Sequence, residues 1–355
     1  MQNNLNAQNE LMGKRLKFAK TGMLIALLSG IGQALNGSMT SLASGLWPFT
    51  DPSYTALTIV VCSFICSGLH DFFSGCWILI WNKLSRRTFT EYVRLLKTKI
   101  GWLLMIGALL GGPIATGGAA AATYLCGPTY SLAISGIYPL IGVLCGVIFL
   151  KEKLTVRTAV GIVIAVAGVL IMSFSPPSGE NFPYFTIGLI FAFVCAIGWG
   201  TEGVFAAYAN DMLDPNISVG TFRSFGSGLF MLFVIVPMVC IFGRLGAGAG
   251  FEILGQAIGQ GTPVLIMIIA ALGGGGSMYF FYQALNSCGI SRTMCINITS
   301  SIWSIPICLV LETCGLMEYE ITGRAIIGAV VIVIGSIIAL AKTDDQDLVS
   351  LRKNK

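Results

Sequence analysis

The chain has 355 residues, of which 55% are hydrophobic and only 10% are charged. An aqueous globule of this length would have too little charged surface and far too many long apolar runs, so the composition excludes one and indicates a membrane protein. The formal net charge of +5 is attributed to membrane topology, and no nucleic-acid partner is expected.

Runs of about 20 apolar residues predict helices that cross the hydrocarbon layer of a bilayer. Ten such runs follow one another along the chain: 17–46, 54–82, 100–125, 129–150, 156–174, 184–209, 218–243, 262–286, 291–312 and 321–341. The first residues, 1–13, are polar and contain no early apolar run, so we expect no cleaved signal peptide. The first span is then itself the insertion signal.

The sequence contains an internal repeat. Residues 139–171 align with residues 306–338 without a gap, at an offset of 167 and with 10 identities in 33 positions. Five spans per repeat is an odd number, so the second copy must be inverted in the membrane, and inverted repeats create a midplane cavity with alternating access. We therefore predict an all-α membrane protein with ten transmembrane helices in two inverted five-helix repeats.

The predicted parts follow from these spans. They are a cytoplasmic tail (1–16), the first five-helix repeat (17–174), an external linker (175–183), the second five-helix repeat (184–341) and a second cytoplasmic tail (342–355). With this orientation 19 of the 21 Lys and Arg residues, Arg223 among them, are assigned to the inside, and only Arg244 and Arg324 lie outside. The positive-inside rule favours this topology. In a bacterium the protein would lie in the cytoplasmic (inner) membrane.

Other motifs point away from enzymes and cofactors. Most of the eleven cysteines lie inside spans and are expected to be free thiols. Cys62, Cys66 and His70 share one helix face, but they extend over about 12 Å of a straight helix and cannot close on one metal ion. The chain has neither a phosphate-binding loop nor a hydrolase motif. We predict no enzyme activity, no cofactor and no metal, and a gradient as the energy source.

Several spans carry polar side chains that must face inward, because lipid cannot satisfy them. Gln33 and Asn36 of span 17–46 occupy places that correspond to Trp199 and Glu202 of span 184–209, and the spans from 262 to 312 carry polar residues at helical spacing. The predicted substrate-binding residues are Gln33, Asn36, Tyr138, Trp199, Glu202, Tyr279, Gln283, Asn297 and Ser301.

Ionisable groups inside spans are the sharpest signals. An unpaired carboxylate there costs roughly 2–3 kcal/mol and is usually kept for function. Glu202 lies on the same face as Trp199, and a carboxylate beside an aromatic ring suits an ammonium group. The alternative is a structural carboxylate bonded to a neighbouring helix. His70 and Asp71 could relay a proton or merely satisfy each other. Glu202, His70 and Asp71 are the proton-coupling candidates.

One group of segments resembles a known family. These are Tyr138-Pro139-Leu140, Phe149-Leu150-Lys151-Glu152-Lys153-Leu154-Thr155, and the glycines Gly161 and Gly168. They resemble EamA-type, ten-helix members of the drug/metabolite transporter superfamily. The resemblance covers residues 17–341, although 317–322 depart from the turn motif in the second half. It implies an inverted five-plus-five helix transporter whose central cavity is lined mainly by helices 1, 3, 4, 6, 8 and 9.

Two functions remain open from the sequence. The first is a secondary transporter that moves a small polar or amine-bearing metabolite by alternating access, with proton coupling or exchange both open. The second is a lipid-handling (flippase-like) or scaffold membrane protein on the same fold. A polar cavity would favour the first, and an apolar lateral opening the second. The expected partners are a small-molecule solute and the lipid bilayer, with a homodimer left open.

Overall fold

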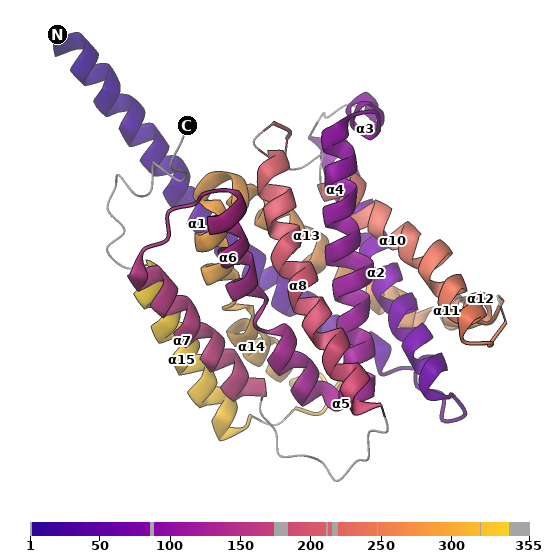
Figure 1. Ribbon diagram of the computed structural model, residues 1–355. Helices are drawn as coiled ribbons and strands as arrows, with labels where there is room; N and C mark the ends of the chain where they lie inside the picture. Colours follow the sequence, from indigo (N-terminus) through magenta and orange to yellow (C-terminus); the bar gives the residue numbers. More distant parts are fainter. Residues whose placement is uncertain are drawn as a thin grey trace.

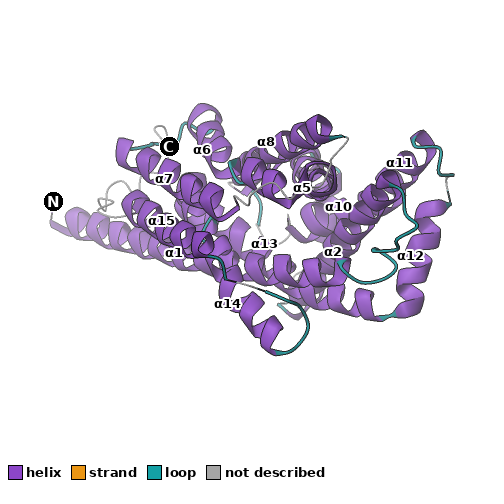
Figure 2. Cartoon of the chain, turned by 90° about the horizontal axis from the view of Figure 1, so that it is seen from below, coloured by secondary structure: helices purple, strands orange, loops and turns teal. Residues whose placement is uncertain are grey.

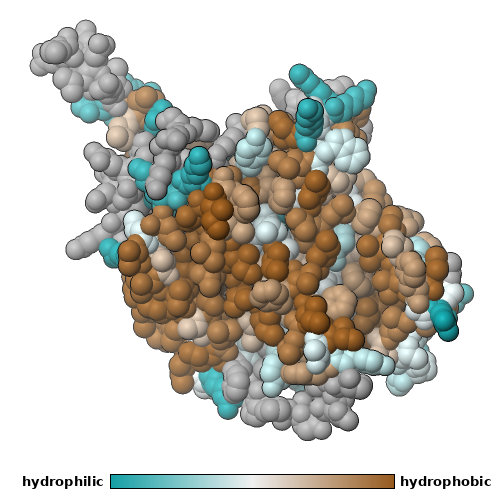
Figure 3. Space-filling model, in the orientation of Figure 1, coloured by the Kyte–Doolittle hydropathy of each residue, from teal (hydrophilic) through white to brown (hydrophobic). Residues whose placement is uncertain are grey.

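The computed structural model describes residues 2–85, 89–173, 184–210, 212–214, 219–246, 248–319 and 321–340. Within these ranges the elements are all helices, and nine of them are long and apolar enough to cross a membrane. Hydrophobic side chains cover the middle of the face seen in Figure 3, with hydrophilic ones at its two ends. The prediction of an all-α, multi-pass membrane protein is confirmed.

Helices of the first half follow the predicted spans closely. They are α1 (Gln2–Ser44), α2 (Ala56–Leu84), α3 (Phe89–Leu96), α4 (Lys99–Leu109), the π-helix η1 (Leu110–Thr116), α5 (Gly117–Ser135), α6 (Tyr138–Phe149) and α7 (Val156–Ser173). Threonines start two of these helices, since the hydroxyls of Thr55 and Thr98 accept the backbone N–H groups of Thr58 and Gly101. The short helix α3 lies between predicted spans.

Helices of the second half are more interrupted. They are α8 (Phe185–Asn210), η2 (Val219–Gly226), α10 (Ser227–Phe230), η3 (Met231–Ile235), α11 (Val236–Phe242), α12 (Ala249–Gln260), α13 (Thr262–Asn297), α14 (Ser300–Thr313) and α15 (Gly323–Leu340). Here α14 is a shorter apolar helix than the nine long ones found in the described ranges. The count of ten spans and the inverted arrangement therefore stay predictions.

Three helix pairs form the frame of the bundle. Helix α1 packs along α13, α5 packs along α8, and α7 packs along α15, as the two views in Figures 1 and 2 show. In the predicted repeat α1 corresponds to α8 and α5 to α13, so the first two pairs are the equivalents that a pseudo-twofold axis requires. This arrangement supports the predicted repeat.

Helices α7 and α15 approach each other through glycine. A Cβ atom on Gly161 would meet the backbone of Gly335 and Ala339, and one on Gly168 would meet Ile332. Small residues permit such close helix packing in membranes. This pair lies at the lower left of the view in Figure 1.

Glycines also break two of the long helices. Gly127 interrupts α5 with φ 82° and ψ 155°, and Gly289 interrupts α13 with φ 80° and ψ 169°. Positive φ values favour glycine because it has no Cβ. Each break is followed by a short helical segment, a turn, and then α6 or α14. The predicted spans 129–150 and 291–312 are therefore each two helical pieces.

The gapless repeat alignment is correct for only part of its length. Helices α7 and α15 begin and end 167 residues apart, as the alignment requires, whereas the two glycine breaks are 162 residues apart. Pro139 is the second residue of α6, but its aligned partner Pro306 lies well inside α14. The loop before α15 is longer than the loop before α7, which shifts the register of the preceding helices.

Candidate functional site

A cavity of about 550 Å³ lies between the two halves of the chain. Six of the nine predicted binding residues line it: Gln33, Tyr138, Trp199, Glu202, Asn297 and Ser301. They come from α1, α6, α8, α13 and α14. The structure thus brings together side chains that are far apart in the sequence.

The other three predicted residues lie elsewhere. Asn36 is buried and accepts a hydrogen bond from the Thr40 hydroxyl (3.1 Å). The Tyr279 hydroxyl accepts from the indole N–H of Trp81 (3.1 Å) at a separate apolar cavity of about 380 Å³ between α2 and α13. Gln283 is half-buried and does not line the larger cavity.

The reason is the rotational position of α13. Its cavity face carries Ser277, Met278 and Phe281, and Tyr279 and Gln283 project at other angles around the helix. The helical spacing of polar residues predicts a polar face on this helix, but it does not predict which other helix or cavity that face contacts.

Hydrogen bonds join the helices along the cavity wall. The Tyr138 hydroxyl donates to Asn297 Oδ1 (2.8 Å), and Asn297 Nδ2 donates to Ser29 Oγ (3.0 Å). The Ser277 hydroxyl approaches both the Ser29 carbonyl (2.9 Å) and Gln33 Oε1 (3.3 Å). This network fixes the polar groups of α1, α6 and α13 relative to one another.

An ion-paired cluster lies beside the cavity, with Arg223 of η2 at its centre. Arg223 Nη1 is 2.8 Å from Asp71 Oδ2 of α2, and its Nε is 2.5 Å from Glu202 Oε1 of α8. All three residues are 4% exposed or less. Glu202 is thus paired with a cation of another helix, which is the structural alternative that the sequence left open, and Arg223 is shared between Glu202 and Asp71.

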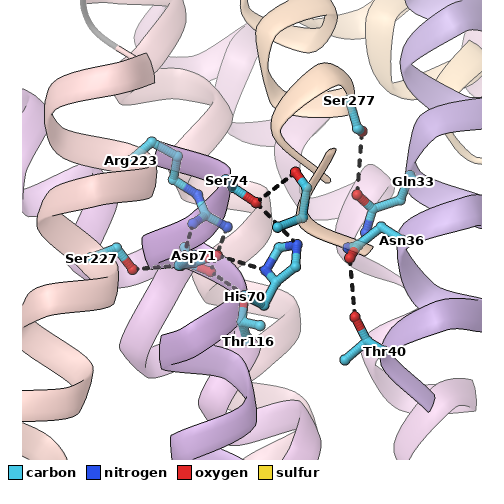
Figure 4. Close-up of polar contacts among 12 residues, drawn as sticks. Gln33, Asn36, Thr40, His70, Asp71, Ser74, Thr116, Arg223, Ser227 and Ser277 are labelled. Carbon is cyan, nitrogen blue, oxygen red and sulfur yellow. Dashed lines mark hydrogen bonds and ion pairs between the residues drawn. The ribbon is translucent and has the colours of Figure 1, made fainter. Parts of the chain in front are cut away.

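Further polar groups complete this cluster. Asp71 accepts from the Ser227 hydroxyl (2.7 Å), and its other oxygen is 3.1 Å from His70 Nδ1 (Figure 4). The second ring nitrogen of His70 is 3.3 Å from Ser74 Oγ. The Tyr282 hydroxyl of α13 donates to Glu202 Oε1 (3.2 Å). We refer to His70, Asp71, Glu202 and Arg223 as the charge cluster.

With Asp71 and Glu202 both ionised and His70 neutral, the charge cluster is one positive charge short of neutrality. Two ionised carboxylates and one guanidinium sum to −1 while His70 is neutral. An uncompensated charge is costly in a buried site within the membrane. The cluster therefore favours one additional cation, which can be a proton or a charged group placed against Glu202 from the cavity.

The π-helix η1 connects the cavity to the charge cluster. Its wider turn and Pro113, which lacks an N–H, disturb the regular helix ladder around Gly111. The Gly111 carbonyl accepts from Trp199 Nε1 (3.1 Å) and Arg223 Nη2 (3.3 Å). A Cβ atom on Gly111 would overlap the Glu202 carboxylate. One backbone carbonyl thus positions a cavity ring and the cluster guanidinium together.

Sequence reasoning missed Arg223 and Gly111. Arg223 was counted among the cytoplasmic cations, yet it is buried and bonded to Asp71 and Glu202. A signal was present, because residue 223 lies inside the predicted span 218–243 and a cation there needs an acidic partner. No sequence signal pointed to the Gly111 carbonyl, which depends on a π-helical turn.

The structure shows where the cysteines and the other side chains that commonly bind metals lie. All eleven cysteines are free. Within the described ranges no group of three or more His, Cys, Asp or Glu side chains could hold a metal ion.

Comparisons with known proteins agree with this fold. The EamA-like transporter family matches residues 20–174. Protein LicB of Haemophilus influenzae is 26% identical over 284 residues, which cover 80% of this chain and 87% of that protein. A solved crystal structure of a protein aligns with a TM-score of 0.60 at 17% identity, over 90% of this chain and 96% of that one, a likeness of fold.

The multi-helix fold is that of a multi-pass membrane protein with a cavity between its two halves. The match to the EamA-like transporter family lies in the first half of the chain and suggests a membrane transporter.

Proposed function

We propose that this chain is a secondary transporter that carries a small polar or amine-bearing solute through the 550 Å³ cavity by alternating access. The observation that carries the proposal is the position of Glu202. Glu202 lines the cavity, and its carboxylate belongs to a charge cluster that lacks one positive charge when both acids are ionised. A solute that brings this charge gains electrostatic stabilisation in a site largely shielded from water.

The cavity wall suits an organic ammonium group. Trp199 and Tyr138 lie edge to face with centroids 5.7 Å apart, and both border the cavity with Glu202. Aromatic faces and a carboxylate attract a cation together. Hydroxyl and amide groups of Asn297 and Ser301 can bond the polar part of such a solute. These polar groups support a carrier of water-soluble solutes, whereas apolar lining residues such as Leu132, Met278 and Phe281 are what the lipid-handling alternative would use.

A solute screen tests this function. Purified protein is heated with amines, amino acids and neutral metabolites in turn, because a bound ligand raises apparent stability by about 2.7 kcal/mol at 100 times its Kd. We expect amine-bearing solutes to stabilise the protein and to enter liposomes that contain it. If only neutral solutes or lipids stabilise it, the amine proposal is wrong.

Coupling is tested separately through the charge cluster. We propose that a proton on His70 or Glu202 can replace the solute cation, which gives either proton coupling or exchange. The pH profile of flux is compared for wild type, Glu202→Gln, His70→Ala and Asp71→Asn. If Glu202→Gln transports normally while either α2 variant changes the profile, coupling resides in α2. If all three variants transport normally, a facilitated or exchange mechanism without these groups is the better explanation.

A further inference from the structure

The loop between α6 and α7 contacts the second half of the chain through Glu152. This side chain is 6% exposed. Its Oε1 accepts the backbone N–H of Ile290 (2.8 Å), and its Oε2 accepts the backbone N–H (3.1 Å) and the hydroxyl (2.7 Å) of Ser291. Hydrogen bonds to an ionised carboxylate are about twice as strong as neutral ones. Glu152 thus holds two segments that are 138 residues apart in the sequence.

The bonded N–H groups exist because of the Gly289 break. A helix that restarts after a break leaves its first N–H groups without helical partners, and these groups favour a negative charge. Lys151, directly before Glu152, has a positive φ of 54°, which is uncommon outside glycine. This backbone turn is part of the loop that brings the Glu152 carboxylate to the broken helix.

Behind this contact lies a layer that separates it from the cavity. Ile290 and Met294 are both 0% exposed. A Cβ on Gly146 would meet Ile290, and a Cβ on Gly142 would meet the end of Met294, so α6 lies directly against both side chains. Asn297, one turn further along, is the first residue of this segment that lines the cavity. These two buried side chains therefore lie between the Glu152 contact and the cavity.

The opposite end of the bundle differs. The loop between α14 and α15 lies at the other end of the molecule from the α6–α7 loop (Figure 1). Its Tyr319 and its exposed Thr322 line the cavity, and its Glu318 is exposed. Residues of this loop therefore connect the cavity to the surface at this end of the bundle.

We propose that Glu152 is a latch that keeps the cavity closed on the α6–α7 side, and that this side opens only when the carboxylate leaves Ile290 and Ser291. The proposal rests on the alternating-access function proposed above. Glu152 acts on the solute through the Ile290–Met294 layer and is a positioning residue for the closed state.

Cysteine labelling tests the latch without a solute. The full-length protein contains Cys288, next to the break and 1% exposed, and Cys240, 0% exposed in a different core cluster. Maleimide labelling of each cysteine is followed by mass spectrometry in wild type, Glu152→Gln and Glu318→Gln. We expect Glu152→Gln to increase the labelling rate of Cys288 about tenfold, because the closed state loses the stabilisation of charged hydrogen bonds. The labelling rate of Cys240 should not change. Glu318→Gln should label like wild type.

Two results would overturn the latch. An unchanged Cys288 rate in Glu152→Gln means that the bonds do not control opening. An equal rise at Cys288 and Cys240 means that Glu152 stabilises the whole fold. Because no solute is present, these results are independent of the screen. A solute screen that finds nothing, together with selective Cys288 labelling, would count against the transporter proposal alone, because the labelling shows separately that the Glu152 bonds control opening on the α6–α7 side.

Discussion

The α7–α15 pair and the charge cluster occupy the same bundle but use polarity in opposite ways. After Arg157 and Arg324 in their first turns, α7 and α15 contain no ionisable side chain, and their glycines align in the repeat. Glu202 of the charge cluster lies in the second repeat, and the corresponding residue of the first repeat is the uncharged Asn36. The two halves have kept the same residues where only close packing is needed, and they differ where a charge is needed.

The largest expected effect comes from removing the cluster cation. Arg223→Met leaves two buried carboxylates without a partner, and we expect a loss of about 3–5 kcal/mol in stability. The measurement is denaturant or thermal unfolding in detergent. Arg157→Met is the matched control, because Arg157 is exposed and bonds only the Ile338 carbonyl in the described contacts. Equal unfolding midpoints for the two variants would contradict the ion-paired cluster.

A smaller loss of stability is expected for a substitution between α7 and α15. Gly161→Val would push a side chain against the backbone of Gly335 and Ala339, and overpacking costs about 1–3 kcal/mol. Gly255→Val is the control, since a Cβ at Gly255 of α12 meets nothing within 4 Å. The same unfolding measurement applies. A Gly161→Val protein as stable as the control would show that the two helices can separate freely.

The smallest loss of stability is expected for a substitution at Trp199, which lines the cavity and shares the Gly111 carbonyl with Arg223. Trp199→Phe keeps a ring in the cavity but removes the indole hydrogen bond to the Gly111 carbonyl, a change of about 1 kcal/mol. Trp102→Phe is the matched variant, because Trp102 of α4 is 65% exposed. If both variants unfold alike, the Gly111 carbonyl does not need its indole donor.

Much of the fold could be predicted from apolar runs, since run length alone decides which helices can cross a bilayer. The breaks at Gly127 and Gly289 could not, because a glycine in an apolar run does not reveal its φ angle. The π-helix η1 was equally hidden. Both features depend on how the surrounding helices pack.

The candidate site was predicted in part for a similar reason. Polarity inside a span indicates an inward-facing side chain, which placed Trp199 and Glu202 at the cavity. It does not say whether the inward neighbour is a cavity or another helix, which is why Tyr279 was assigned to the wrong surroundings. The pairing of Glu202 with Arg223 required knowing that η2 packs against α2 and near α8.

Solute flux with and without the Glu202 charge is the decisive measurement. Protein in liposomes is given the amine-bearing solute found by the screen, and wild type is compared with Glu202→Gln and with Glu252→Gln, an exposed acid on α12. We predict that Glu202→Gln stays folded, because the cluster then carries one carboxylate per guanidinium, and that its affinity for the solute falls at least about tenfold. Glu252→Gln should behave as wild type. Unchanged affinity, rate and pH profile in Glu202→Gln would show that Glu202 is structural and that the solute binds elsewhere.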